Sequence, residues 1–165
     1  MIALPINGIS DEDAPAFSVL RHILGGFQER LYSEIREKEG YAYWLRLAGL
    51  ATPTAGWIGV HTGATKSNLP AIERVARAQL DRIASEPVSA DELERARRFL
   101  TTAEARADAT NDDRATSLSL ALLDGWPLRS YEERATRLAA VTPEQVRDLA
   151  RRLFQGKHYA IVTLQ

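Results

Sequence analysis

Strand and helix patterns do not alternate along this chain, and this order constrains its fold more than any other feature. An apolar strand is expected at residues 2–6, followed by two helical patterns that a Gly-Gly pair separates. Strands at 42–51 and 57–62 flank a short turn, which predicts an antiparallel hairpin. The rest is helical up to an apolar strand at 159–164. We therefore predict an α+β fold with helices on one face of a mostly antiparallel sheet, and not a doubly wound parallel sheet.

Three of the later helices have recognisable starting residues. Asn68 is expected to cap a helix that runs to about residue 85. Ser89 and Thr142 each begin a capping box, with a glutamate or a glutamine three residues later. The polar stretch at 111–113 either breaks the helix that begins after Ser89 or only keeps it solvated.

Composition excludes several classes of protein. The 165 residues are 45% hydrophobic and carry a net charge of −1, which suits one globular domain and gives no basic field for nucleic acid. No apolar run reaches the length of a membrane-spanning helix, so we expect no membrane insertion. The chain has no cysteine, which excludes disulfides, thiolate zinc ligands and a cysteine nucleophile.

The first residues already have a strand pattern, and no basic segment followed by a long apolar one marks a signal peptide. A strand that starts at residue 2 predicts that residues 1–165 form a single domain taken from a longer chain. A small native protein is the competing interpretation.

The histidines give little support for a metal site. His22, His61 and His158 each lack a histidine four residues away, so neither H-E-x-x-H nor H-x-x-E-H is present. His22 also follows Arg21, and a cation beside a single ligand makes a poor zinc site. We expect no metal site and no catalytic residue in this chain. The alternative is a zinc hydrolase whose dispersed site includes His22 or His61.

One segment resembles a known family. Residues 23–43 read ILGGFQERLYSEIREKEGYAY and resemble a signature of the pitrilysin/insulinase-type zinc peptidases, which include the mitochondrial processing peptidase and bacterial relatives. The helix starts at Ser89 and Thr142 and the apolar last strand resemble later parts of the family in the same order. Two positions depart from the signature: Glu29 replaces a serine and Tyr41 replaces a leucine.

The resemblance implies one particular half of such a peptidase. Family members consist of paired halves of similar fold, and the zinc-bearing half carries H-x-x-E-H on its first helix. The matching helix here reads SVLRH at residues 18–22, so only His22 survives and Arg21 replaces the general base. An arginine cannot accept a proton from the attacking water. The chain therefore resembles the inactive, non-zinc half, the C-terminal half-domain.

In that half the family has an arginine and a tyrosine seven residues apart that contact the bound peptide. The corresponding residues here are Arg36 and Tyr43. A guanidinium and a phenol are both suitable donors to the backbone carbonyls of an extended peptide, or to the oxyanion that develops during its hydrolysis. The alternative is that Arg36 is a solvated cation at a helix end and that Tyr43 is a core aromatic.

These residues imply a function that is shared with a partner. We expect the chain to close over an extended or unfolded polypeptide that a zinc-bearing half cleaves, in cis or in trans, with the zinc held by that half. A scaffold subunit of the same fold is one alternative. An unrelated α+β binding domain is another, and helices on both faces of the sheet would favour it. The resemblance suggests the bacterial periplasm, with the cytoplasm second.

Overall fold

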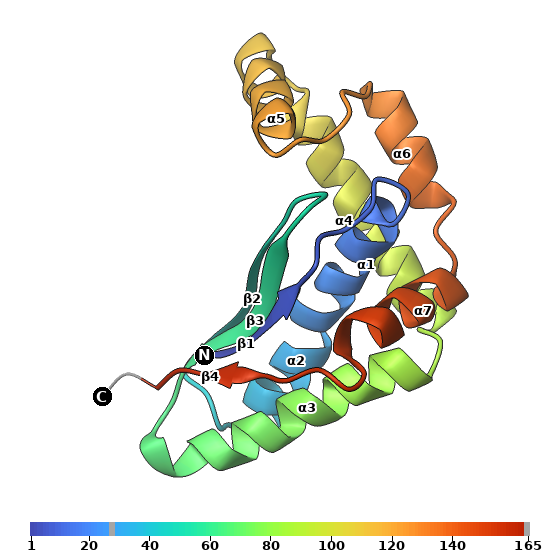
Figure 1. Ribbon diagram of the computed structural model, residues 1–165. Coiled ribbons are helices and arrows are strands. Elements are labelled where there is room, and N and C mark those ends of the chain that lie inside the picture. Colours follow the sequence, from blue (N-terminus) through green and yellow to red (C-terminus); the bar gives the residue numbers. More distant parts are fainter. Residues whose placement is uncertain (27–28, 164–165) are drawn as a thin grey trace.

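The computed structural model describes residues 1–26 and 29–163 and contains one four-stranded sheet (Figure 1). The strand order is β2-β3-β1-β4, and all three neighbouring pairs are antiparallel. The strands are β1 (Ile2–Ile6), β2 (Trp44–Ala51), β3 (Gly56–Gly63) and β4 (Ala160–Ile161). The predicted α+β class and the hairpin are therefore confirmed.

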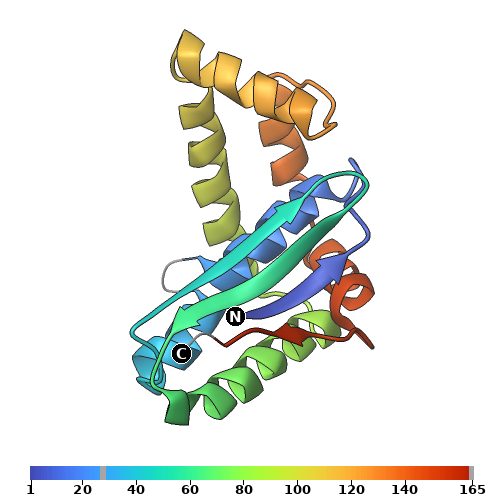
Figure 2. The ribbon, with the colours of Figure 1, turned by 60° about the vertical axis from the view of Figure 1, so that its left-hand side comes forward.

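Helices cover one face of this sheet. The helical elements are α1 (Ala14–Gly25), α2 (Arg30–Tyr32), the π-helix η1 (Ser33–Lys38), the 3₁₀-helix η2 (Lys66–Asn68), α3 (Leu69–Ser85), α4 (Ala90–Ala107), α5 (Asn111–Leu123), α6 (Tyr131–Ala139) and α7 (Pro143–Phe154). Helices α1, α3 and α7 lie behind the sheet, and in the described part of the chain its front face is open (Figure 2). This arrangement confirms the one-sided packing that the sequence predicts.

The core lies between the sheet and α1. In β1 alternate side chains are buried, and Ile2 and Leu4 pair with Val60 and Ile58 of β3. All four are buried, as are the inward residues of α1, which include Val19, Leu20, Ile23 and Leu24. The sequence predicts β1 from its short apolar run and α1 from the helical spacing of its apolar residues, while the structure shows that alternate residues of β1 are buried.

Two surfaces of the domain expose large apolar side chains. On the open side of the sheet, Trp44, Leu50 and Trp57 are exposed. Helix α5 projects at the far end of the molecule (Figures 1 and 2), and none of its residues is buried. Its Leu122 and Leu123 are 62% and 82% exposed. Within the described residues, no helix is long and apolar enough to cross a bilayer.

Several boundaries differ from those predicted. Strand β2 begins at Trp44 rather than at residue 42, and β4 has two residues rather than six; residue 164 of that predicted strand lies outside the described residues. The polar stretch at 111–113 follows a true break, because α4 ends at Ala107 and the Thr110 hydroxyl caps α5 by accepting from the Asp113 N–H at 3.1 Å.

The capping boxes at Ser89 and Thr142 are both formed, as predicted. The capping role predicted for Asn68 is wrong. Asn68 occupies the N-cap position of α3, but its side chain makes no capping bond there and its Nδ2 donates to the Tyr41 carbonyl at 3.0 Å. A tertiary contact therefore replaces the local one.

Candidate peptide-contact site

Arg36 lies in the π-helix η1, which the sequence pattern did not predict. This helix continues α2 directly and ends at a glycine turn. Gly40 adopts a φ of 63° and its N–H donates to the Arg36 carbonyl at 3.1 Å, while the Tyr41 N–H donates to the Ile35 carbonyl at 3.0 Å. A positive φ favours glycine, so Gly40 sets the point at which the chain turns toward β2. Short π-helical turns occur frequently at functional sites.

The segment that carries Arg36 is held firmly against the rest of the domain. Leu31 of α2 and Ile35 of η1 are fully buried. Both helices pack against α3, and the bond from Asn68 to the Tyr41 carbonyl ties the following turn to the start of α3. The position of Arg36 is therefore set by packing and not by the helix alone.

Tyr43 directly precedes β2 and is 68% exposed. Its N–H donates to the Gly63 carbonyl at 2.8 Å, which fixes the backbone at the end of the hairpin. The prediction's alternative, in which Tyr43 is a core aromatic, is wrong. Its exposure results from its place outside the strand ladder, where the alternation of inward and outward side chains no longer applies.

Arg36 is half-buried, and its guanidinium carbon lies 5.7 Å from the centre of the Tyr32 ring, in cation–π geometry. Within the described residues it forms no ion pair, and no hydrogen bond joins it to Tyr43. The structure thus places the two residues at either end of one short turn and leaves the polar groups of both side chains able to donate to a ligand. Tyr43 directly precedes β2, which is an edge strand of the described sheet.

Two ion pairs link the start of this segment to α4. Glu29 accepts hydrogen bonds from Nε and Nη2 of Arg95 at 3.3 and 3.2 Å, and Arg30 donates from Nε and Nη2 to Glu92 at 2.6 and 3.0 Å. Sequence reasoning missed both pairs, since their partners are more than sixty residues apart. The one signal was Glu29 itself, a charged residue at a position where the family signature has a serine.

Glu92 is the most strongly perturbed acid of the site. Burial alone would raise its pKa, but hydrogen bonds from Arg30 and Ser89, together with the charge of Arg30, outweigh burial and lower the pKa to about 2. The carboxylate is therefore ionised at any ordinary pH and holds a permanent negative charge beside α2.

The contacts of the His22 ring account for its position without a role as a metal ligand. Its ring stacks on Phe99 with the centroids 4.3 Å apart, and its Nε2 lies 4.0 Å from Oε1 of Glu29. Burial, aided by the charge of Arg95, lowers the pKa of His22, and the charge of Glu29 only partly opposes this. The imidazole is thus a neutral stacking partner near neutral pH.

The other two histidines lie elsewhere. His61 is on β3, where its Nδ1 lies 3.3 and 3.2 Å from two nitrogens of Arg46, and His158 is exposed just before β4. In residues 1–26 and 29–163, no three His, Cys, Asp or Glu side chains are grouped so that they could hold a metal ion. The residues present therefore do not fit the zinc site of a catalytic half.

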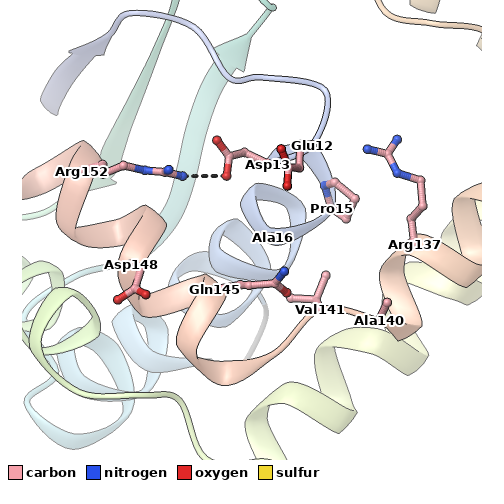
Figure 3. Close-up of a pocket in the computed structure, with 10 residues that line it drawn as sticks. All are labelled: Glu12, Asp13, Pro15, Ala16, Arg137, Ala140, Val141, Gln145, Asp148 and Arg152. Atoms are coloured by element: carbon pink, nitrogen blue, oxygen red, sulfur yellow. Dashed lines mark hydrogen bonds and ion pairs between the residues drawn. The ribbon is translucent and has the colours of Figure 1, made fainter.

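A cavity of about 350 Å³ lies between the start of α1, the end of α6 and α7 (Figure 3). An ion pair between Arg152 and Asp13, 2.6 Å long, crosses it, and Arg137 on its wall is paired with Asp11. These charges are already satisfied by one another. The cavity includes neither Arg36 nor Tyr43, so it is separate from the candidate site.

Comparison with known proteins agrees with this fold. A family model described as the peptidase M16 inactive domain matches residues 1–100. An uncharacterized zinc protease of Streptomyces coelicolor is 28% identical over 152 residues, which are 92% of this chain and 33% of that protein. A crystal structure of a peptidase M16 inactive domain from Pseudomonas fluorescens has a TM-score of 0.73 at 24% identity and is matched over 92% of this chain and 37% of its own. An inactive peptidase domain from Bordetella parapertussis has a TM-score of 0.77 at 19% identity, over 98% of this chain and 92% of its own.

The chain spans about a third of the length of the curated relative that it matches. The family match confirms the resemblance to the pitrilysin/insulinase-type zinc peptidases and to their inactive half, and it overturns the alternative of an unrelated α+β domain. The solved structures extend the likeness in fold to α5–α7, which lie beyond the residues that the family model matches. The chain belongs to the family of peptidase M16 inactive domains.

Proposed function

We propose that this domain pairs with a zinc-bearing peptidase half and helps to hold an extended polypeptide while that half cleaves it. The zinc and the general base belong to the other half, and this chain contributes binding contacts. One observation carries the proposal: in residues 1–26 and 29–163, no hydrogen bond uses the side-chain donors of Arg36 and Tyr43, and these residues flank a turn that the buried side chains of α2 and η1 hold in place. The proposal is the same whether the zinc-bearing half is fused to this chain or separate.

The edge strand beside these residues supports binding of an extended peptide. In the described sheet, β2 pairs with β3 on one side only. Alternate N–H and C=O groups of such a strand point outward and can pair with an added strand. A peptide added along β2 would pass Tyr43 at the start of the strand, where the phenol could donate to a peptide carbonyl.

The exposed apolar surfaces support a paired half. The open sheet face exposes Trp44 and Trp57, and the projecting helix α5 exposes Leu120, Leu122 and Leu123. Exposed large apolar side chains at neighbouring helix positions, as on α5, are typical of an interface with another domain. We assign these surfaces to contact with the zinc-bearing half.

Turnover by the paired halves tests the proposal. We expect Arg36→Ala and Tyr43→Phe each to lower kcat/KM for fluorescein-labelled unfolded casein by about tenfold, the effect of one lost hydrogen bond to a charged or polar group. Lys38→Gln is the matched control, because Lys38 lies on the same helix but is exposed, and its ion pair is with Glu34 of that helix. It should leave turnover unchanged.

Two results would overturn the proposal. Unchanged turnover in both variants, with unfolding midpoints like that of the wild type, would remove the substrate contact and leave a scaffold role. Hydrolysis of casein by this chain alone, abolished by a chelator, would show that the domain carries its own metal centre, and metal analysis of the purified chain would then identify it.

A further inference from the structure

The start of the helix that carries Arg36 is held by charges from a distant helix and not by a local cap. Glu29 occupies the N-cap position of α2 but makes no capping bond with its side chain. Its carboxylate, 8% exposed, instead accepts both hydrogen bonds from Arg95 on α4. The orientation of the first turn of α2 is therefore fixed by Arg95 of α4.

In the neighbouring ion pair the base, Arg30, is on α2 and the acid, Glu92, is on α4, which is the reverse of the Glu29–Arg95 pair. The side chains of Arg30 and Glu92 are 11% and 17% exposed, and two parallel hydrogen bonds join them. An acid and a base at the start of α2, Glu29 at the N-cap and Arg30 in the helix, thus face a base and an acid on α4. Two-point pairs of this kind have strict geometry, so only one register and rotation of α2 against α4 satisfies both of them.

The Glu92 side chain is also held by hydrogen bonds within its own helix. Its Oε2 accepts from the N–H and the hydroxyl of Ser89 at 2.9 and 3.0 Å, and the Ser89 hydroxyl in turn accepts from the Glu92 N–H. This capping box locks the carboxylate to the first turn of α4. The Glu92 carboxylate therefore has a fixed position, to which Arg30 must adapt.

Stability alone does not explain the Arg30–Glu92 pair. Within the described residues, Nη1 of Arg30 is buried without a hydrogen-bond partner, an arrangement that destabilises. Buried ion pairs often add no more stability than apolar side chains of the same size. The packing of α2 and η1 already rests on Leu31 and Ile35, which are fully buried. What the pair adds is orientation.

We propose that Arg30 and Glu92 are positioning residues, which set the direction in which η1 presents Arg36 to a bound polypeptide. The inference rests on the proposed function, because it needs Arg36 to contact the peptide. The pair acts through Arg36 and touches no substrate itself. Arg30 lies six residues before Arg36 on one continuous helical segment, so a rotation at the start of α2 moves the guanidinium directly.

A double-mutant cycle tests this dependence. The variants are Arg30→Met and Glu92→Gln, singly and together, each with Arg36 present and with Arg36→Ala, in the chain paired with its zinc-bearing half. Glutamine retains the capping box at position 92. We expect the double variant to lower kcat/KM for labelled unfolded casein by about fivefold with Arg36 present, and by less than about twofold with Arg36→Ala. A merely structural pair predicts the same loss in both backgrounds.

The controls separate failure of the inference from failure of the proposed function. Arg82→Met removes an exposed pair with Glu86 and should change neither value. If neither Arg36→Ala nor Tyr43→Phe has an effect, the proposed function falls and the inference with it; if Arg36→Ala alone has no effect, only the inference is overturned. Suppose instead that Arg36→Ala lowers kcat/KM. If the Arg30→Met/Glu92→Gln double variant then lowers kcat/KM equally with Arg36 and with Arg36→Ala, or has no effect, only the inference is overturned. Should Arg30→Met fail to fold, Arg30→Lys keeps one hydrogen bond, and its smaller loss must also disappear with Arg36→Ala.

Discussion

Acid should destabilise this domain through Glu92. The pKa of its carboxyl falls from an ordinary 4.5 to about 2 on folding, because the hydrogen bonds and charge of Arg30 and the hydrogen bonds from Ser89 outweigh the opposing effect of burial. A depression of this size corresponds to about 3 kcal/mol of folding stability at neutral pH. Since Glu92 is not wholly removed from solvent, we expect about 1–2 kcal/mol. The contribution is present above about pH 4.5 and disappears as the pH falls toward about 2.

Urea unfolding followed by circular dichroism measures this contribution in the isolated chain. Glu92→Gln should be less stable than the wild type by about 1–2 kcal/mol near pH 7, and the difference should shrink steadily below about pH 4. Glu86→Gln is the control, because its pair with Arg82 is exposed, and we expect it to follow the wild type throughout. A difference between wild type and Glu92→Gln that stays constant with pH would refute the reasoning.

Three further substitutions test the stability of the structure around the site. Leu31→Ala removes a fully buried side chain and should lower the free energy of unfolding by about 2–5 kcal/mol in urea, whereas a loss below about 1 kcal/mol would contradict the burial of α2. Gly25→Ala would place a Cβ 2.1 Å from the Cβ of Leu47, so we expect a loss of about 1–3 kcal/mol by the same measurement; unchanged stability would contradict the close approach of α1 to β2. Tyr43→Phe should shift the thermal unfolding free energy by less than about 0.5 kcal/mol, and a larger loss would give the exposed hydroxyl a structural role.

The parts of the fold that local chemistry sets could be predicted from the sequence. Ser89 and Thr142 begin helices where they were expected, because a capping box involves only four consecutive residues. The helical spacing of the apolar residues in α1 identifies its buried face because it too is a local pattern. The order of these elements was then enough to predict the class of fold and the one-sided sheet.

The parts that depend on distant partners could not be predicted. Asn68 bonds to Tyr41 instead of capping its own helix, and the partners of Glu29 and Arg30 lie on α4. The π-helix also escaped prediction, since the spacing of Leu31 and Ile35 suits an ordinary α-helix equally well. At the candidate site, the sequence and the resemblance named Arg36 and Tyr43, but only the structure shows that Tyr43 is exposed and how the turn is held.

Photo-crosslinking at position 43 tests most directly whether this domain contacts the polypeptide. p-Benzoylphenylalanine replaces Tyr43 in one sample and Leu123 in another, each paired with the zinc-bearing half from which zinc has been removed, so that casein binds without being cleaved. Leu123 is the control because it is 82% exposed at the end of α5, the helix that we assign to contact with the other half. We predict that labelled casein is captured at position 43 in clear excess over position 123. Equal yields at the two positions, or none at position 43, would contradict a role for this domain in holding the substrate.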